Sequence, residues 1–568
     1  MKRFNFILMS ALLAGIVFSG CNPLKKMKDA ASDVKYTVNP PVLELVGDQV
    51  HVTINGNYPP KYFNQNVILT LTPYLQAGSN ELDFDAYKVQ GESVSENNKV
   101  IKYEGGSFSY TSKVPYKPEF QKSEMKMRIA AQFKSKSLDF DAVKLADGII
   151  TTCLLVEKDG KAIYAGDKYV RITPDKYEAA IKYMIQQSDV RSGEANKPEV
   201  KALIDAVKAA AANERIEFKG SELTGHASPD GPVELNSKLS ESRKSTGLDF
   251  FQKSFKSAKA DDALKSVNAV SRGEDWEGFE KMMKESNISD KELVLRVLSM
   301  YSDSEVRDRE LHNIAKAWKE IADQILPELR RSKLAVNIEL VGLSDEEINA
   351  QFDNDPSVLK LEEILYAGTI ATDVNRKLAV YQAAAKQYPE DWRTKNNLGA
   401  ALLNLGRTAD AKSALNDAKN LANNETVKNN LAVIELRDGN LDAAEELLNS
   451  AGSANEVKYN LGIIKIIQGN YNDAISHFGN QVEVNAAIAK LLAKQNEEAL
   501  STLNSIKRDD AIVFYLKAIV GARTSNNDLL MDNLRTACQK SASLKANAKN
   551  DLEFGKYFED STFKSIVN

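Results

Sequence analysis

The chain has 568 residues, of which 43% are hydrophobic and 27% are charged, a composition typical of globular proteins with packed cores. This length exceeds that of a single domain, so we expect several domains. The net charge of −5, with no basic domain, argues against nucleic acid as the main partner.

The first residues have the pattern of a secretory signal. Lys2 and Arg3 precede an apolar run over 6–18, which two small residues and Cys21 follow. The apolar run is short for a membrane span. A plain cleaved signal and an N-terminal membrane helix are the alternatives.

This combination resembles the lipobox of bacterial lipoproteins. The resemblance implies that residues 1–20 are removed and that Cys21 carries fatty-acyl lipid such as palmitate, with 21–35 as a polar tether. Asn22 after the cysteine is not Asp, which by analogy permits sorting to the outer membrane. A basic stretch at 25–28, in place of an acidic cluster, favours a lipid-anchored protein that faces the periplasm.

The next region, residues 36–175, alternates apolar and polar side chains. Val50 and Val52, for example, alternate with polar neighbours, which is the period of half-buried strands. We expect an all-β sandwich of the immunoglobulin type, single or double. Asp159-Gly160 lies between two strand-like runs and predicts a hairpin turn.

Residues 176–350 alternate between strand and helix patterns, which indicates an α+β fold. The patterns predict strands at 183–190, 215–223 and 334–340, and helices at 198–212, after Gly231 and at 309–325. A mostly helical stretch at about 256–308 has the character of an insertion. It could wall a ligand cleft or simply lengthen the domain.

Polar residues converge in one stretch of this α+β region. A β-run leads into a turn at 228–231, and an amphipathic helix follows. Asn236, Ser240 and Arg243 lie at i, i+4 and i+7 and form a polar stripe on that helix. The strand end, the turn and the stripe therefore meet at one place, which can hold a small charged ligand.

This stretch resembles the OmpA-like peptidoglycan-binding domain. The family pattern, Gly-His-Thr-Asp, a turn with glycine and Asn-x-x-Leu-Ser-x-x-Arg-Ala, is matched at Gly225, His226, Gly231, Asn236, Leu239, Ser240 and Arg243. In that family an Asp and an Arg grip the diaminopimelate of the stem peptide. The resemblance implies that the Arg243 guanidinium forks onto the diaminopimelate carboxylate.

The chain departs from the family pattern at Ser228, which stands where the family has Asp. A neutral hydroxyl cannot supply an anionic partner for an ammonium, and Asp230 can do so only if the turn differs. The residues expected at a stem-peptide site are His226, Ser228, Asp230, Asn236 and Arg243. The alternative is a plain strand–turn–helix in which Asn236 and Arg243 are solvated or cap the helix.

Residues 351–568 contain a helical repeat. Asn-Asn-Leu-Gly at 396–399 recurs as related sequence at 429–432 and 459–462, in steps of 33 and 30 residues. Each copy is followed by a turn glycine (Gly406, Gly439, Gly469), an alanine (Ala411, Ala444, Ala474) and a large apolar residue (Leu415, Leu448, Phe478). Small residues let paired helices approach closely, and large ones fill the groove between neighbours.

This pattern resembles the tetratricopeptide repeat, and an unrelated helix bundle is the alternative. The resemblance implies a superhelix of about five or six repeats that binds a protein partner on its concave face. Asn396 and Asn429 could bind the backbone of a peptide, or they could be ordinary helix-surface residues.

The sequence shows no catalytic constellation. The four histidines, His51, His226, His312 and His477, form no HExxH or paired metal spacing, and GxSxG and nucleotide-binding glycine motifs are absent. Cys153 and Cys538 form no readable disulfide framework, and we expect both to be packed. We therefore expect no enzymatic activity, cofactor or metal.

These patterns predict a non-enzymatic outer-membrane lipoprotein scaffold. It would link the envelope, through peptidoglycan if the α+β domain binds it, to a protein partner on the repeats. The alternative is a protein-only assembly factor of an outer-membrane complex, whose OmpA-like domain no longer binds peptidoglycan.

Overall fold

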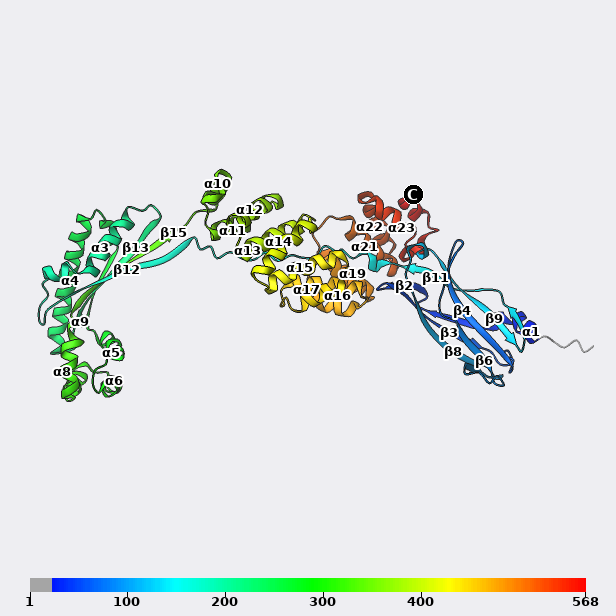
Figure 1. The fold of residues 1–568 in the computed structure, drawn as a ribbon, viewed down its shortest axis with the longest axis horizontal. Helices are drawn as coiled ribbons and strands as arrows, with labels where there is room; N and C mark the ends of the chain where they lie inside the picture. The colour runs from blue at the N-terminus through cyan, green and yellow to red at the C-terminus, as the bar shows by residue number, and fades with distance from the viewer. Residues whose placement is uncertain (1–22) are drawn as a thin grey trace, which may run out of the picture. The chain divides into compact units, whose positions relative to one another are not determined.

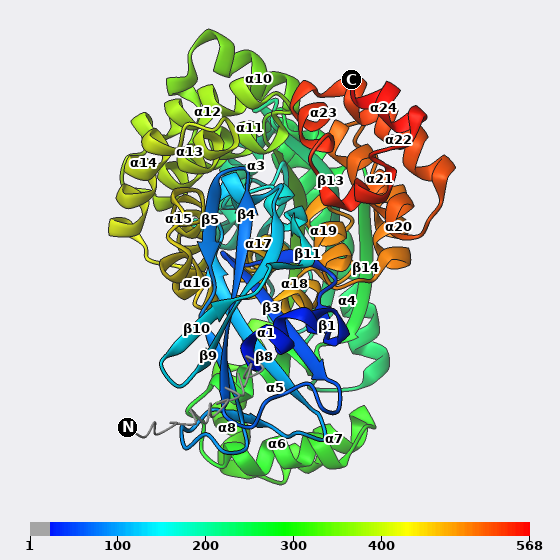
Figure 2. The ribbon, with the colours of Figure 1, turned by 90° about the vertical axis from the view of Figure 1, so that its right-hand side faces the viewer.

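The computed structural model describes residues 23–568, so the signal region and Cys21 lie outside the described residues. The chain divides into two compact units. Figures 1 and 2 colour the chain from the N-terminus to the C-terminus and label the elements of each. The first unit joins the residues up to 165 with 388–568, and the second consists of 166–387. Within 23–568, no helix has both the length and the apolar character needed to cross a membrane.

The N-terminal part of the first unit is rich in strands, as the alternation predicted (Figure 1). A short helix, α1 (Pro23–Asp29), precedes β1 (Lys35–Asn39), β2 (Val42–Val46), β3 (Gln49–Tyr58), β4 (Val67–Ala77), β5 (Asn80–Asp83), β6 (Tyr87–Gly91), β7 (Lys99–Ile101), β8 (Gly106–Pro115), β9 (Glu124–Phe133), β10 (Lys136–Asp139) and β11 (Val143–Ile150). Antiparallel ladders join β3 to β1 and β8, and β4 to β6 and β9. Strand β2 connects the two ladders because it pairs with both β3 and β11.

One hydrophobic core lies between these ladders. The alternate residues Val50, Val52 and Ile54 of β3 are buried, as the sequence pattern predicted. They share a cluster with Leu69 of β4 and Met125 of β9. Side chains from both ladders therefore point inward, while the intervening polar residues face outward.

The hairpin predicted around Asp159-Gly160 is wrong. Residues 152–155 form a 3-10 helix, and no residue of 156–171 lies in a strand. Cys153 lies in this 3-10 helix, where it is buried and its Sγ donates to the Leu45 carbonyl at 3.4 Å. Burial raises the pKa of the Cys153 thiol to about 12.

The C-terminal part of the first unit consists of successive helices that pack in pairs. They are α13 (Trp392–Asn404), α14 (Thr408–Leu421), α15 (Glu425–Asp438), α16 (Leu441–Asn449), α17 (Asn455–Ile467), α18 (Tyr471–Phe478), α19 (Val484–Leu492), α20 (Asn496–Ser505), α21 (Ala511–Arg523), α22 (Asn527–Lys540), α23 (Ala542–Ala548) and α24 (Ser561–Val567). A Cβ added at Gly399 would lie 2.5 Å from Leu415, and one at Gly462 would lie 2.6 Å from Phe478. The predicted close approach of paired helices at small residues is confirmed.

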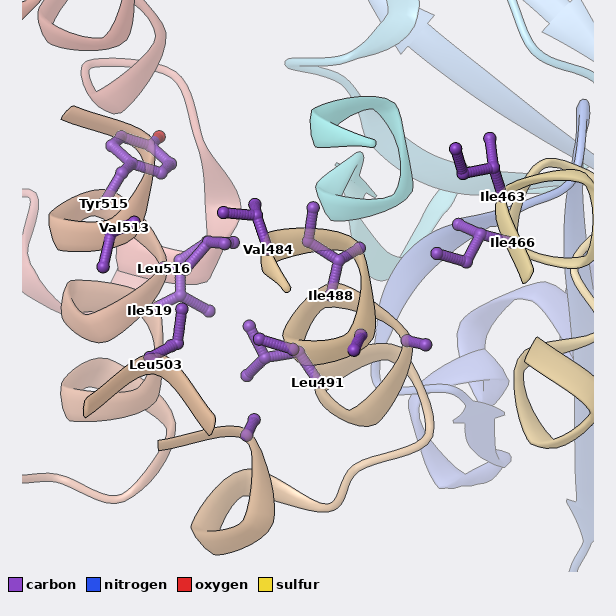
Figure 3. Packing of buried hydrophobic residues seen from close by; sticks show 14 of the residues in the cluster. Ile463, Ile466, Val484, Ile488, Leu491, Leu503, Val513, Tyr515, Leu516 and Ile519 are labelled. Atoms are coloured by element: carbon purple, nitrogen blue, oxygen red, sulfur yellow. The ribbon is translucent and has the colours of Figure 1, made fainter. Parts of the chain in front are cut away.

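The helix pairs share a continuous apolar core. Figure 3 shows Val484, Ile488 and Leu491 of α19 between residues of neighbouring helices, such as Ile466 and Ile519. Each pair therefore buries apolar surface against the next, which is the basis of stability in helical repeats.

The second unit contains a four-stranded sheet, and its strands follow the order β12-β15-β13-β14. They are β12 (Ile172–Lys182), β13 (Ile216–Ala227), β14 (Val267–Glu274) and β15 (Arg331–Val341). The connecting helices are α2 (Ser192–Ala195), α3 (Pro198–Ala211), α4 (Val233–Ser257), α5 (Trp276–Glu285), α6 (Lys291–Met300), α7 (Ser304–His312), α8 (Ala315–Gln324) and α9 (Leu326–Leu329). Val200 and Val207 of α3 and Phe251 and Phe255 of α4 share a core with the sheet.

Several sequence predictions for this unit need correction. The first strand is 172–182, and 183–190 contains none. The single helix predicted at 309–325 is in fact parts of two helices, α7 and α8, and residues 313–314 lie between them. The stretch assigned to an insertion holds β14, which pairs parallel with β13 and is part of the sheet.

Three further helices complete the second unit. They are α10 (Asp345–Asn354), α11 (Leu361–Ile370) and α12 (Val374–Gln387). Gly368 of α11 lies against Tyr381 of α12, where an added Cβ would be 2.3 Å from the ring. This pair therefore packs by the same small-against-large contact as the repeats of the first unit.

Candidate functional site

A cavity of about 330 Å³ lies in the second unit where β13 meets α4. Four of the five residues that the sequence selected for a ligand site line it, namely Ser228, Asp230, Asn236 and Arg243. They come together because β13 ends at Ala227 and α4 begins at Val233, so that the strand, the turn and the first turns of the helix are contiguous. The fifth residue, His226, does not line the cavity.

Arg243 is 1% exposed, and its guanidinium is directed at backbone carbonyls. Its Nε donates to Gln187 at 3.0 Å, Nη1 to His226 at 3.1 Å and Nη2 to Met184 at 3.3 Å. Burial, helped by the nearby positive charge of Arg330, lowers the pKa of Arg243 to about 10. Arg243 therefore holds α4 against the segment after β12 and the end of β13.

Asp230 and Ser228 share one cationic neighbour, Arg330. Its Nε donates to the Ser228 hydroxyl at 3.1 Å, and its Nη2 pairs with the Asp230 carboxylate at 3.3 Å. The turn thus places the Asp230 carboxylate in the cavity. This position is the one that Asp230 needs if it is to act as the anionic partner of a ligand ammonium. Arg330 lies about 100 residues further along the chain, and no motif in the sequence indicated it.

Asn236 fixes the turn against the sheet. Its Nδ2 donates to Glu274 at 2.8 Å and lies 3.4 and 3.3 Å from the carbonyl oxygens of Asp230 and Gly231. Since Asn236 is 3% exposed, it is neither solvated nor a surface cap.

His226 lies beside the cavity wall. Its Nε2 is 3.0 Å from the Thr224 hydroxyl, and its Nδ1 has no hydrogen-bond partner, although Asp275 is 3.7 Å away. Burial lowers the pKa of His226, which favours the neutral ring. Among residues 23–568, no three His, Cys, Asp or Glu side chains are grouped to hold a metal ion.

Helices α7 and α8 supply another side of the cavity through Asp308, His312 and Trp318. The His312 and Trp318 rings stack with their centroids 3.7 Å apart. The Asp308 Oδ1 is buried and makes no hydrogen bond, although His312 Nδ1 lies 3.3 Å away, and desolvation raises the pKa of this carboxyl. The sequence pointed to this side of the cavity only through the helical stretch at about 256–308, which was expected to be able to wall a ligand cleft. Asp308 is the last residue of that stretch.

A second candidate site lies on the first helices of successive repeats, α13, α15, α17 and α19. Six asparagines there have no exposed surface, and we call them the asparagine ladder: Asn396, Asn397, Asn429, Asn430, Asn460 and Asn485. Residues 157–165 of the same unit lie against it, and we call them the inner segment.

Four rungs of the ladder bind the backbone of the inner segment in the same way. Each side-chain Oδ1 accepts from an N–H, and its Nδ2 donates to the carbonyl of the same residue, at 2.7–2.9 Å. The pairs are Asn397 with Ala165, Asn430 with Ile163, Asn460 with Lys161, and Asn485 with Glu157. An amide that bonds both groups of one residue reads the extended backbone without regard to the side chain.

Asn396 and Asn429 join these rungs together. Asn396 donates to the Ile163 carbonyl at 3.1 Å, and Asn429 donates to the Lys161 carbonyl at 3.0 Å. Of the two alternatives that the sequence left open for these asparagines, binding to polypeptide backbone is the one found, and the bound segment belongs to the same chain. Their adjacency to Asn397 and Asn430 was visible in the repeated motif, whereas Asn485 stood outside it.

No family model and no curated protein matches this chain. Among solved structures, a crystal structure of the APC/C hetero-tetramer Cut9-Hcn1 aligns with 60% of this chain and 76% of its own, at 15% identity and a TM-score of 0.32. A Salmonella alpha-2-macroglobulin mutant aligns with 94% of this chain and 27% of its own, at 11% identity and a TM-score of 0.14. Both likenesses are too distant to support an argument, so the chain's function has to be inferred from its own residues.

Proposed function

We propose that the chain is a non-enzymatic scaffold of the bacterial cell envelope, anchored in the outer membrane by lipid on Cys21 and facing the periplasm. The lipobox-like sequence before Cys21 supports the anchor. A strand-rich region, an α+β domain with a polar cavity and a helical repeat region follow it. The repeats, which we infer to be of the tetratricopeptide type, would hold a protein partner.

The α+β domain is proposed to be OmpA-like and to bind the stem peptide of peptidoglycan. The observation that carries this proposal is the meeting of Ser228, Asp230, Asn236 and Arg243 in one cavity. Its volume of about 330 Å³ lies at the small end of ligand pockets. Diaminopimelate carries both ammonium and carboxylate groups, and this cavity offers the carboxylates of Asp230 and Asp308 and the guanidinium group of Arg243.

The Arg243 guanidinium retains donors for a ligand although it holds the backbone. A guanidinium has five N–H donors, and the three bonds to carbonyls use one on each nitrogen, which leaves one N–H on each terminal nitrogen. These two can fork onto a carboxylate. Asp230 and Asp308 are then the anionic groups available to an ammonium.

A specific observation favours the alternative, a protein-only assembly factor. Asp230 already pairs with Arg330 at 3.3 Å, and Ser228 is neutral and bonded to the same guanidinium. An internally paired carboxylate competes with a ligand ammonium. In this alternative the α+β domain is a scaffold without a ligand.

The test is a pull-down of the lipid-free chain, residues 22–568, on purified diaminopimelate-type peptidoglycan. We expect the parent to pellet and Asp230→Asn to remain in solution. Asp249→Asn, which changes an exposed carboxylate on α4 away from the cavity, is the matched control and should pellet like the parent. If the folded parent does not pellet, the protein-only alternative holds.

Arg243→Ala is a less specific probe of binding. The substitution removes a guanidinium that holds three carbonyls, so the domain loses internal contacts as well as a ligand group. Its loss of binding is informative only if circular dichroism shows that the fold is kept.

A further inference from the structure

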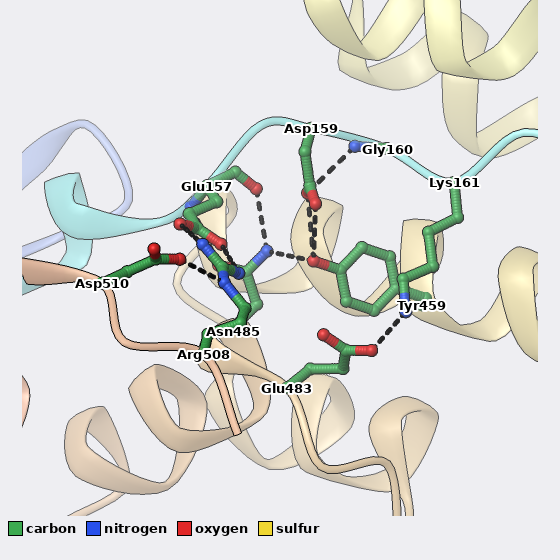
Figure 4. Close-up of polar contacts among 9 residues, drawn as sticks. All are labelled: Glu157, Asp159, Gly160, Lys161, Tyr459, Glu483, Asn485, Arg508 and Asp510. Atoms are coloured by element: carbon green, nitrogen blue, oxygen red, sulfur yellow. Dashed lines mark hydrogen bonds and ion pairs between the residues drawn. The ribbon is translucent and has the colours of Figure 1, made fainter. Parts of the chain in front are cut away.

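The inner segment is bound through side chains as well as backbone (Figure 4). The Glu157 carboxylate accepts from both terminal nitrogens of Arg508, each at 3.0 Å. Such two-point pairing of guanidinium and carboxylate fixes geometry as well as charge. The start of the inner segment is therefore held by charge in addition to the Asn485 rung.

The middle of the inner segment packs around Tyr459, a residue of α17 (Figure 4). The Tyr459 hydroxyl donates to the Asp159 carboxylate at 3.0 Å. The Lys161 ammonium lies 4.2 Å from the centre of the Tyr459 ring and pairs with Glu483. Burial raises the pKa of Asp159, as expected for a carboxylate held away from water.

Gly160 accommodates a change of spacing along the ladder. Asn397, Asn430 and Asn460 bind positions 165, 163 and 161, which are two residues apart. The next rung, Asn485, binds position 157, which is four residues before 161. Gly160 has a φ of +57°, and a Cβ there would lie 2.8 Å from Val433. Only glycine meets both conditions without strain.

The ladder has little hydrogen-bonding capacity left for another peptide. Asn430 uses both donors and both acceptor positions, because it binds the two backbone groups of Ile163, donates to Asn396 and accepts from Asn429. Asn460 likewise binds both groups of Lys161 and donates to Asn429. An external peptide could reach these amides only by displacing the inner segment.

The inner segment also has the advantage of being tethered. A segment joined to its groove by a short linker acts at an effective concentration of the order of millimolar. A single residue separates the inner segment from η3 (Thr152–Leu155), and this helix belongs to the same unit as the groove. A free peptide with the same contacts therefore competes at a disadvantage.

We propose that the inner segment is a built-in ligand that closes the repeat groove. The groove is a receptor for an extended polypeptide, read through its backbone, with an acid, a glycine and a lysine in the register of Glu157, Gly160 and Lys161. While the inner segment is bound, a protein partner of the repeats has to dock outside the asparagine ladder. This inference does not depend on whether the α+β domain binds peptidoglycan.

The first test opens the groove in the whole chain, residues 22–568. Residues 157–165 are replaced by a Gly/Ser sequence of equal length with proline at positions 161, 163 and 165, because proline lacks the N–H that each of these rungs binds. The probe is a fluorescent peptide with the sequence of 155–167. We expect the opened variant to bind this peptide by fluorescence anisotropy, and the parent to bind at least tenfold more weakly. Equal binding by both proteins would overturn the proposal.

Two controls make the binding specific. Asn430→Ala on the opened background should weaken the peptide at least tenfold, because it removes a whole rung. A peptide of the same composition in scrambled order loses the register of the glycine, the acid and the lysine. It should bind the opened variant as weakly as the ordered peptide binds the Asn430→Ala protein. If the opened variant is folded and does not bind the ordered peptide, the groove is not a receptor.

A second measurement uses the unmodified segment, in case the opened variant does not fold. Hydrogen exchange of the parent should show the amides of Lys161, Ile163 and Ala165 to be protected, because each donates to a buried asparagine. Asn460→Ala should accelerate exchange at Lys161 at least tenfold. Unprotected amides at all three positions in the parent would mean that the groove is open.

Discussion

The groove of the first unit and the cavity of the second both collect polar side chains, yet these side chains differ in their partners. The ladder asparagines are bonded to each other and to the inner segment, with no exposed surface. The cavity contains Asp308 Oδ1, which is buried and makes no hydrogen bond, with His312 Nδ1 3.3 Å away. Buried polar atoms in native proteins are usually hydrogen-bonded, and the groove follows this rule, whereas the cavity keeps a carboxylate oxygen without a hydrogen bond.

The largest expected effect is at the ladder. Asn430→Ala removes bonds to both backbone groups of Ile163 and to Asn396 and Asn429. Each buried polar group left without a partner costs about 1–3 kcal/mol, so we expect a loss of about 4 kcal/mol in the free energy of unfolding, measured with urea. Asn404→Ala is the matched control, because it breaks one exposed hydrogen bond, to the Tyr164 hydroxyl. It should change the free energy of unfolding by less than about 1 kcal/mol. Equal effects would remove the contrast between the two regions.

The next effect is at the base of the cavity. Arg243→Ala should lower the stability of the second unit by about 3 kcal/mol, because three carbonyls lose their donor and a buried volume is emptied. Urea unfolding followed by near-ultraviolet circular dichroism measures it. The exposed Lys238, also on α4, is the control, and Lys238→Ala should have little effect. A stable Arg243→Ala variant would assign the guanidinium to the ligand alone.

A third prediction concerns a buried carboxylate in the first unit. Asp551 is 3% exposed, and burial, aided by the charge of Glu553, raises its pKa from 3.8 to about 6. The protonated form is therefore favoured in the folded state, and this contribution is complete below pH 4 and lost as the pH rises through 6. Relative to Asp551→Asn, the parent should lose at most about 3 kcal/mol of stability over that window.

Thermal unfolding at pH 4 and pH 7 measures this difference. Asp532→Asn, an exposed change on α22, is the control and should show no such window. A pH-independent difference between the parent and Asp551→Asn would mean that Asp551 keeps its ordinary pKa, and that the first unit tolerates a buried carboxylate without cost.

The smallest effect on stability is expected at Asp308. Asp308→Asn removes a carboxylate whose buried Oδ1 makes no hydrogen bond and whose neighbour, His312, is half exposed, so the unfolding free energy should change by less than about 1 kcal/mol. Its effect on peptidoglycan pelleting should be far larger if this carboxylate receives a ligand ammonium. Marked destabilisation by Asp308→Asn would show that the cavity is internally satisfied, as the groove is.

The sequence by itself determined the features that depend on neighbours along the chain. Strand alternation placed Val50 and Val52 inside the β-rich region, and small residues such as Gly399 marked the close approach of paired helices. Ser228 and Arg243 could be assigned to one cavity because a single strand, turn and helix carries both. Such features follow from the period of a strand or a helix.

The tertiary structure decided the features that depend on distant partners. Arg330 and Asp308 reach the cavity from elements far along the chain, and no local period indicates them. The inner segment has the alternation of a strand, but the asparagines of remote helices satisfy its backbone instead of a neighbouring strand. An extended segment shows the same pattern in a sheet and in a groove, so only the fold could decide which of them takes its hydrogen bonds.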